Sequence, residues 1–438
     1  MRRAMRGASV AVIAGAMLAT TATMSAAVTP TGVSAGTSAA APKPVTERVT
    51  VSATGEQGNA NSYGPEFSAD GRFALFSADA SNLVPGDTNT SSDVFVRDQR
   101  KGTVERVSVS SDGAQSDGTS NALSISADGR YVLFRSNARN LVHWDNPPTD
   151  VGAYDIYLHD RRTGTTERTS VALDGGSALA GGAIISANGR YIAFNAKADR
   201  METSPGDLFG AVYVLDRRTG EVERVSNRDR RTNPALLEGV SADGRYVAYT
   251  QPVPRSSNGV TWVHDRRTGT EEQVNVRPDG SSAERYAMPA SLSADGRTIA
   301  FSYWGDDLVP DETPGDVNHL YVRDLRTDVT RRVDAGTAGE ERLREPQLSP
   351  DGRYLAYQAD PRSADGQLAA ANVYLRDLRT GSTRLVSESV TGGPVRDEDV
   401  TAYSVSAGAR RIGLASYSAQ LVPDDTNGAY DGFVRRLP

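Results

Sequence analysis

Short apolar runs of strand length recur along the whole chain, with polar turns between them. In one stretch the run YVLF at 131–134 is followed by DIYLHD at 155–160 and then by TERTSV at 166–171. Val, Ile, Tyr and Phe dominate such runs, and Asp-Gly or Asn-Gly pairs mark turns, as is typical of β-hairpins. No segment with apolar residues at a helical period competes with this pattern. The sequence therefore predicts an all-β fold.

A pentapeptide marks the unit of repetition. SADGR or a variant of it occurs seven times, and successive copies begin between 52 and 60 residues apart. One apolar run precedes each copy and one follows it, and a second pair of runs encloses a turn such as RRTG. Four strands per unit at this period predict the blades of a β-propeller. The copies begin at Ser68, Ser126, Ser186, Ser241, Ser293, Ser349 and Ser406.

The two ends of the chain complement each other. The segment TERVTVS at Thr46–Ser52 resembles a fourth strand but precedes every first strand, and the last unit ends at Pro438 without a fourth strand. Pairing Thr46–Ser52 with Gly432–Arg436 would remove the exposed sheet edge at the ends. We therefore predict a seven-bladed β-propeller of four-stranded antiparallel blades, with the N-terminal strand completing the last blade.

The pentapeptide is interpreted as a structural element. A catalytic residue is needed once, whereas a turn is needed in every blade, and Asp-Gly is a favoured turn pair. We expect its arginines, such as Arg72, to form ion pairs between blades, with Asp98, Asp160 and their equivalents as partners.

Three segment types together resemble the TolB-type, or WD40-like, β-propeller repeat family. They are the SADGRYVAF-type segment, the NLVPGDTN-type loop and the VFVRDxRTGTTERVSV-type hairpin, and they extend from Thr46 to Pro438. The resemblance implies the propeller fold. The chain has no separate N-terminal α/β domain and has seven repeats, whereas TolB has such a domain and six blades, so the partner of TolB is not carried over. Propellers host many unrelated activities, so function must be argued from the site.

The N-terminus is typical of an export signal. Arg2, Arg3 and Arg6 precede the apolar stretch Ala8–Ala19, and small residues follow. We predict a signal peptide at 1–28, a flexible linker at 29–45 and the propeller at 46–438, and hence a secreted protein. The chain contains no cysteine, which excludes disulfides and thiol chemistry.

Charge and hydropathy limit the kinds of partner that the chain is expected to bind. The 55 acidic residues outnumber the 48 basic ones and give a net charge of -7. This charge argues against nucleic acid, because phosphate binding needs a positive surface. No apolar segment beyond the predicted signal is long enough to span a membrane. We expect a monomer with a protein or glycan ligand.

The loop LVPGDTNTSSD and its counterpart LVPDDTNGAYD are candidate calcium sites. They place Asp87, Asn89 and Asp93 in the first blade and Asp425, Asn427 and Asp431 in the last blade. Oxygen side chains at alternate positions resemble the start of a calcium loop, but the glycine and the closing acid of an EF-hand are missing. The alternative is that Asp and Asn stabilise the turn that enters a strand. No other cofactor is indicated.

Two tryptophans are candidate partner-binding residues. Trp144 and Trp304 lie beside acidic residues in loops between second and third strands. These loops vary most and share one face, where propellers commonly bind ligands. Local packing under a loop is the alternative for each tryptophan. The sequence favours a binding or scaffolding module in the cell envelope or outside the cell. The alternative is a carbohydrate-active lyase or hydrolase with unrecognised carboxylates at the propeller axis.

Overall fold

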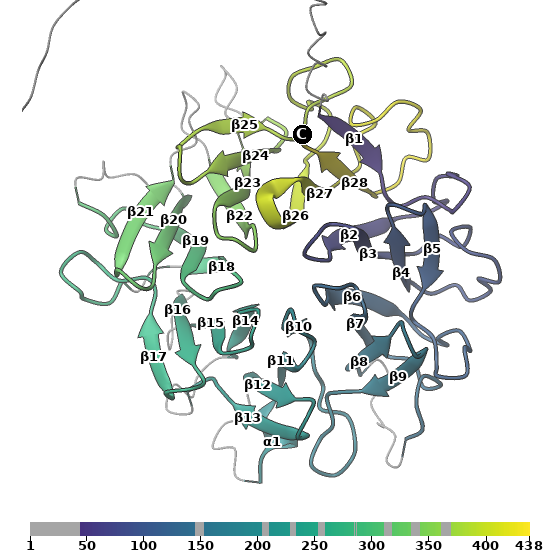
Figure 1. The fold of residues 1–438 in the computed structure, drawn as a ribbon, viewed down its shortest axis with the longest axis horizontal. Coiled ribbons are helices and arrows are strands. Elements are labelled where there is room, and N and C mark those ends of the chain that lie inside the picture. The colour runs from purple at the N-terminus through teal and green to yellow at the C-terminus, as the bar shows by residue number, and fades with distance from the viewer. Residues whose placement is uncertain are drawn as a thin grey trace, which may run out of the picture. The chain divides into compact units, whose positions relative to one another are not determined.

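Seven four-stranded antiparallel sheets surround one centre (Figure 1). The computed structural model describes residues 44–144, 153–203, 210–227, 234–252, 259–283, 285, 287–310, 318–333, 342–360 and 369–438. Within these ranges the only helices are the short α1 (Ala198–Met201) and a 3-10 turn at Ala407–Ala409. The predicted all-β, seven-bladed propeller is confirmed. The predicted signal peptide (1–28) and linker (29–45), apart from the last two linker residues, lie outside the described residues.

Each blade begins with the strand nearest the centre and ends with the outermost strand (Figure 1). Blades 1 to 3 contain β2 (Ser62–Phe67), β3 (Phe73–Ala78), β4 (Asp93–Asp98), β5 (Thr103–Arg106); β6 (Ser120–Ile125), β7 (Tyr131–Ser136), β8 (Asp155–Asp160), β9 (Thr165–Arg168); β10 (Ala183–Ile185), β11 (Tyr191–Lys197), β12 (Gly210–Asp216), β13 (Glu221–Arg224). Blades 4 and 5 contain β14 (Leu236–Val240), β15 (Tyr246–Pro252), β16 (Gly259–Asp265), β17 (Thr270–Gln273); β18 (Ala287–Leu292), β19 (Thr298–Trp304), β20 (Asn318–Asp324), β21 (Val329–Val333). Blades 6 and 7 contain β22 (Arg342–Leu348), β23 (Tyr354–Asp360), β24 (Asn372–Asp377), β25 (Thr383–Leu385); β26 (Thr401–Val405), β27 (Arg411–Ser416), β28 (Asp431–Arg436) and β1 (Val45–Arg48).

The N-terminal strand closes the ring as predicted. β1 pairs antiparallel with β28, with Val45 opposite Arg436 and Arg48 opposite Phe433. The strand is shorter than the predicted Thr46–Ser52, because the chain turns after Arg48 and Val51 forms an isolated bridge with Gln57. None of the helices in the described ranges has the length and apolar character that a membrane crossing requires.

The pentapeptide turns join neighbouring blades through the backbone. The Ala69 amide donates to the carbonyl of Ala127, and the Ala127 amide donates to the carbonyl of Ala187. Across the ring closure, the amide of Ala407 in the last blade donates to Ala69. The structural interpretation of the motif is therefore supported by contacts that hold the blades together.

The arginine of the pentapeptide pairs within its own blade, so the expected ion pairing between blades is wrong for this residue. Arg72 lies 2.6 Å from Asp98, and Arg130 lies 2.5 Å from Asp160. The reason is geometric: both turns lie on the same face, and Phe73 pairs directly with Asp98 in the sheet, which brings Arg72 to the end of β4. The prediction therefore named the correct aspartates, but each of them belongs to the same blade as its arginine and not to a neighbouring blade.

The hydrophobic core lies within and between the sheets. Phe76 stacks on Phe95 in blade 1 with ring centroids 5.7 Å apart, and Phe134 stacks on Tyr157 in blade 2 at 5.6 Å. Gly129 has a φ of 72°, and a Cβ there would lie 2.1 Å from the ring of Phe73 in the preceding blade. Neighbouring blades therefore pack closely enough that this turn requires glycine.

Candidate functional site

The predicted calcium ligands of the first blade surround an arginine. Arg106, at the end of β5, places Nη1 3.4 Å from Asp87 Oδ1 and 3.3 Å from Asp93 Oδ2. Asn89 donates to Asp93 Oδ2 at 3.4 Å and to the carbonyl of Ser116 at 2.8 Å. The three predicted side chains do meet, and a guanidinium lies among them.

The last blade repeats this arrangement with the residue that closes the ring. Arg48 of β1 places Nη2 2.8 Å from Asp425 Oδ2 and Nε 3.1 Å from Asp431 Oδ2. Asn427 donates to Asp431 at 2.9 Å, and the hydroxyl of Thr50 donates to it at the same distance. The strand β1 is thus fixed to the blade by an ion cluster as well as by sheet pairing.

These clusters are buried and carry their own positive charge. Asp93 and Asp431 are both fully buried, and burial raises the pKa of each carboxyl while hydrogen bonds and the neighbouring arginine oppose that rise. In the described part of the chain, no group of three or more His, Cys, Asp or Glu side chains is placed to hold a metal ion. The guanidinium supplies the charge that the sequence hypothesis assigned to calcium. Calcium binding at these loops stays a prediction.

The two tryptophans both contact arginines. Trp144 is partly buried against the core between blades 1 and 2, with the guanidinium of Arg168 3.9 Å from its ring centroid and that of Arg139 5.8 Å away. Trp304 ends β19, and the guanidinium of Arg342 lies 5.5 Å from its ring centroid. A partner-binding role for either tryptophan stays a prediction.

Residues that do not repeat from blade to blade occupy the inner strands. Two to four positions before the pentapeptide, blade 1 has Glu66, blade 4 has Glu238, blade 6 has Glu345 and blade 7 has Tyr403. The pairing register shifts in this part of β2, β14, β22 and β26, and also in β6 and β18, so the bulge is a repeated feature of the inner strands. Glu345 also has a φ of 54°. Positive φ values at non-glycine residues cluster at functional sites.

The inner carboxyls have perturbed acidities. Burial among the strands raises the pKa of Glu66 to about 7 and that of Glu238 to about 7. The charge of Glu345 contributes to the rise at Glu238, and it also contributes to a raised pKa of Tyr403, for which burial is the main cause. Glu345 therefore acts on residues from blades 4 and 7 at once. A carboxyl with a pKa near 7 can exchange a proton at neutral pH.

Four tyrosines from the first and last blades gather at the ring closure. The ring centroids of Tyr63 and Tyr430 are 5.8 Å apart, and those of Tyr417 and Tyr430 are 4.9 Å apart. Tyr403 belongs to the same group, because Tyr430 and Tyr63 both contribute to its raised pKa. Tyr63 is 39% exposed and Tyr417 is 49% exposed. We call Tyr63, Tyr403, Tyr417 and Tyr430 the tyrosine cluster.

A pocket of about 380 Å³ adjoins the tyrosine cluster. Its polar residues include Glu66, Ser77, Asn121 and Arg135, and Arg135 Nε donates to Asn121 at 3.3 Å. Tyr63 and Tyr403 line it as well. This axial pocket thus offers aromatic faces, a carboxyl, an amide and a guanidinium from inner parts of blades 1, 2 and 7.

The predicted calcium loop of the last blade positions part of the tyrosine cluster. Tyr417 and Tyr430 lie between β27 and β28, in the loop that also contains Asp425. Arg48 holds this loop through Asp425, and Asn61 accepts a hydrogen bond from the Tyr430 amide at 2.9 Å. The motif therefore anchors a surface loop across the junction of blades 1 and 7.

Sequence reasoning missed the tyrosine cluster and the inner carboxyls. The available signal was a comparison of the repeats for residues that break the pattern, which singles out Glu66, Glu238, Glu345 and Tyr403. The convergence of Tyr63 with Tyr417 and Tyr430 could have followed from ring closure, because closure makes blades 1 and 7 neighbours.

Comparisons with known proteins show the fold. No family model matches the chain, and no curated protein matches it. A solved oligogalacturonate lyase from Vibrio parahaemolyticus is 13% identical with a TM-score of 0.54, and the match covers 91% of this chain and 98% of that one. The β-propeller domain of the Trilobed protease from Pyrococcus furiosus is 11% identical with a TM-score of 0.52, covering 86% and 93%.

TolB proteins are also among the similar solved structures. TolB from Acinetobacter baumannii is 17% identical with a TM-score of 0.41, and the match covers 70% of this chain and 61% of TolB. The two propellers with TM-scores above 0.5 agree with the propeller fold that the repeat motifs predict. At these identities the likeness describes the fold and carries no activity.

Proposed function

We propose that this protein is an exported binding or scaffolding module that holds a protein or glycan ligand at the tyrosine cluster. The observation that carries the proposal is the group of four tyrosines beside the axial pocket, with Tyr63 and Tyr417 exposed. Exposed tyrosines offer large apolar area with a hydroxyl at the rim and are enriched at binding sites. The site would act in the cell envelope or outside the cell.

The proposed binding face is the one that carries the loops between second and third strands. Tyr417 and Tyr430 belong to such a loop in the last blade. Tyrosine rings stack on sugar rings or on apolar side chains, while Asn121 and Arg135 can bind carbonyl, hydroxyl or carboxylate oxygens. A ligand with both apolar faces and oxygen acceptors fits this set of groups.

Replacing Tyr63 and Tyr417 together with alanine is expected to weaken ligand binding at least tenfold. Each is an exposed aromatic, and loss of a central aromatic contact commonly costs about 2 kcal/mol. Retention of envelope proteins and of chito-, gluco- and galacturono-oligosaccharides on the immobilised chain identifies the ligand, and titration calorimetry then measures affinity. Val222→Ala, at an exposed position of the outer strand β13, is the control. Equal affinity in the double variant and the control would refute the proposed site.

A lyase or hydrolase acting on carbohydrate is the second candidate, and the raised pKa of Glu66 favours it. Glu66 lines the axial pocket, so a carboxyl able to exchange a proton near pH 7 lies at the proposed ligand site. The solved oligogalacturonate lyases share the propeller fold, which motivates the choice of substrate.

Incubation with oligogalacturonate separates the two candidates. A lyase would produce unsaturated ends that absorb ultraviolet light, a hydrolase would produce reducing ends without that absorption, and a binding module would leave the chains intact. Enzymatic turnover should fall at least a hundredfold in Glu66→Gln, because the amide keeps the shape and cannot exchange the proton. Turnover that is unchanged in this variant would exclude Glu66 from catalysis.

A further inference from the structure

An arginine of the chain itself fills the gap between blades 1 and 2. The guanidinium of Arg161 lies 4.6 Å from the ring centroid of Phe73. Arg161 Nη1 donates to the carbonyl of Gly129, and Nη2 donates to Glu105 at 3.0 Å. The gap is thus a socket made of an aromatic face, a glycine carbonyl and a glutamate, with a guanidinium in it.

The next two gaps contain the same socket with the same occupant. Between blades 2 and 3, Arg217 lies 4.3 Å from the Tyr131 centroid and donates to the Gly189 carbonyl at 2.7 Å. Arg217 also pairs with Glu167. Between blades 3 and 4, Arg266 stacks on Tyr191, donates to the Gly244 carbonyl and pairs with Glu223.

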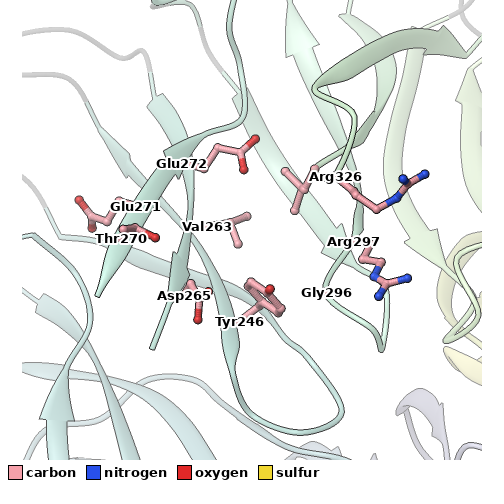
Figure 2. Close-up of a pocket in the computed structure, with 10 residues that line it drawn as sticks. Tyr246, Val263, Asp265, Thr270, Glu271, Glu272, Gly296, Arg297 and Arg326 are labelled. Atoms are coloured by element: carbon pink, nitrogen blue, oxygen red, sulfur yellow. The ribbon is translucent and has the colours of Figure 1, made fainter. Parts of the chain in front are cut away.

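The gap between blades 4 and 5 keeps the socket and lacks the arginine. Tyr246, Gly296 and Glu272 stand at the positions of the aromatic, the glycine and the glutamate, and Leu325 stands at the position of the arginine. A pocket of about 390 Å³ lies here and is lined by these four residues (Figure 2). Because leucine is shorter and uncharged, it leaves the place of the guanidinium open.

The acceptor groups of the socket are only partly used by the chain's own donors. Arg323 donates to Glu272 Oε1 at 3.2 and 3.3 Å and also pairs with Asp328, and no described side chain is seen to donate to Oε2. In the described part of the chain, no side chain donates to the Gly296 carbonyl. Figure 2 shows the guanidinium groups of Arg297 and Arg326 on the side away from Glu272. Neither arginine therefore takes the vacant position.

We infer that the pocket between blades 4 and 5 is a guanidinium-binding site that takes an arginine side chain. The ligand would stack on Tyr246 and donate to the Gly296 carbonyl and to Glu272, as the chain's own arginines do in the three preceding gaps. Guanidinium is favoured over ammonium, because a planar fork can stack on the ring and bond two acceptors at once. This site lies on the turn face and is separate from the tyrosine cluster.

Thermal melting with capped amino acids tests the inference on the full chain. N-acetyl-arginine methylamide at millimolar concentration is expected to raise the Tm, since binding to the native state alone stabilises it, while N-acetyl-lysine methylamide is not. Leu325→Arg should fill the socket, raise the Tm by itself and abolish the response to the arginine probe. Absence of a shift with the arginine probe, an equal shift with lysine, or an undiminished shift in Leu325→Arg would each overturn the inference.

A reciprocal variant keeps the test decisive if Leu325→Arg folds poorly. Arg217→Leu empties the gap between blades 2 and 3, so it should lower the Tm and create a second site for the probe. The arginine probe should therefore raise the Tm of Arg217→Leu by more than it raises that of the wild type. An equal increase in the two proteins would contradict the proposed guanidinium site. Free arginine distinguishes the sources: weaker binding than the capped form points to an arginine within a peptide, and equal binding points to a small molecule.

Discussion

Replacing Arg48 with methionine is expected to lower the free energy of unfolding by about 3–5 kcal/mol, because it leaves buried carboxylates without their cation. The side chain of Arg48 is 9% exposed and that of Asp431 is 0% exposed. Asp431 already has a pKa raised by burial, and Arg48 is one of the groups that oppose the rise. Chemical denaturation followed by circular dichroism measures the loss. The variant should also bind the ligand less well, because Arg48 anchors the loop that carries Tyr417 and Tyr430.

Two further variants show whether the buried charge is the cause. Arg100→Met removes an exposed arginine whose partner Asp70 lies 3.9 Å away, and it should change stability by less than about 1 kcal/mol. Adding Asp431→Asn to Arg48→Met should recover part of the loss, because it removes the unpaired charge. Equal losses in Arg48→Met and Arg100→Met would contradict the account.

Thermal melting with and without calcium tests the calcium hypothesis. A rise in Tm with calcium, absent with EDTA and removed by Asp87→Ala and Asp425→Ala, would establish a metal site at these loops. An unchanged Tm would leave Arg48 and Arg106 as the only cations that the two clusters need.

Replacing Gly129 with alanine is expected to destabilise the propeller by about 2–5 kcal/mol. Alanine at a φ of 72° costs about 1–2 kcal/mol, and the new Cβ would meet the Phe73 ring at 2.1 Å, where overpacking costs about 1–3 kcal/mol more. The contact joins blades 1 and 2, so the substitution should loosen the ring between them. Equilibrium unfolding of the purified variant measures the effect.

Gly102→Ala is the matched control for this substitution. Gly102 also has a φ of 72°, and nothing lies within 4 Å of the added Cβ. Its cost should be limited to the backbone term of about 1–2 kcal/mol. The difference in stability between the two variants measures the effect of the contact between blades. Equal losses would mean that the Phe73 side chain moves aside without lowering the stability.

The fold was predictable from sequence because its signals repeat. The apolar run at 155–160 predicts a strand, and β8 covers Asp155–Asp160. Closure was predictable for a different reason: a fourth strand without a preceding blade can pair only with a blade that lacks one. Strand ends were less certain, as the early end of β1 at Arg48 shows.

The site was less predictable because its residues meet only through the ring. Tyr63 and Tyr430 are hundreds of positions apart and touch because closure joins their blades. The prediction that Asp87, Asn89 and Asp93 lie close together is correct, because the three residues are near one another in sequence. The arginine among them, Arg106, comes from β5 and was not predicted. Repetition revealed what the blades share, whereas ligand contacts rest on what they do not share.

The central claim is that the tyrosine cluster and axial pocket hold the ligand. Hydrogen–deuterium exchange on the full chain, with and without the ligand captured as described above, tests it most directly. The account predicts that ligand-dependent protection falls on residues 62–67 and 417–430, and that it disappears in the variant with alanine at Tyr63 and Tyr417. Protection confined to the loops of Trp144 or Trp304, or to the gap between blades 4 and 5, with residues 62–67 and 417–430 unchanged, would contradict it.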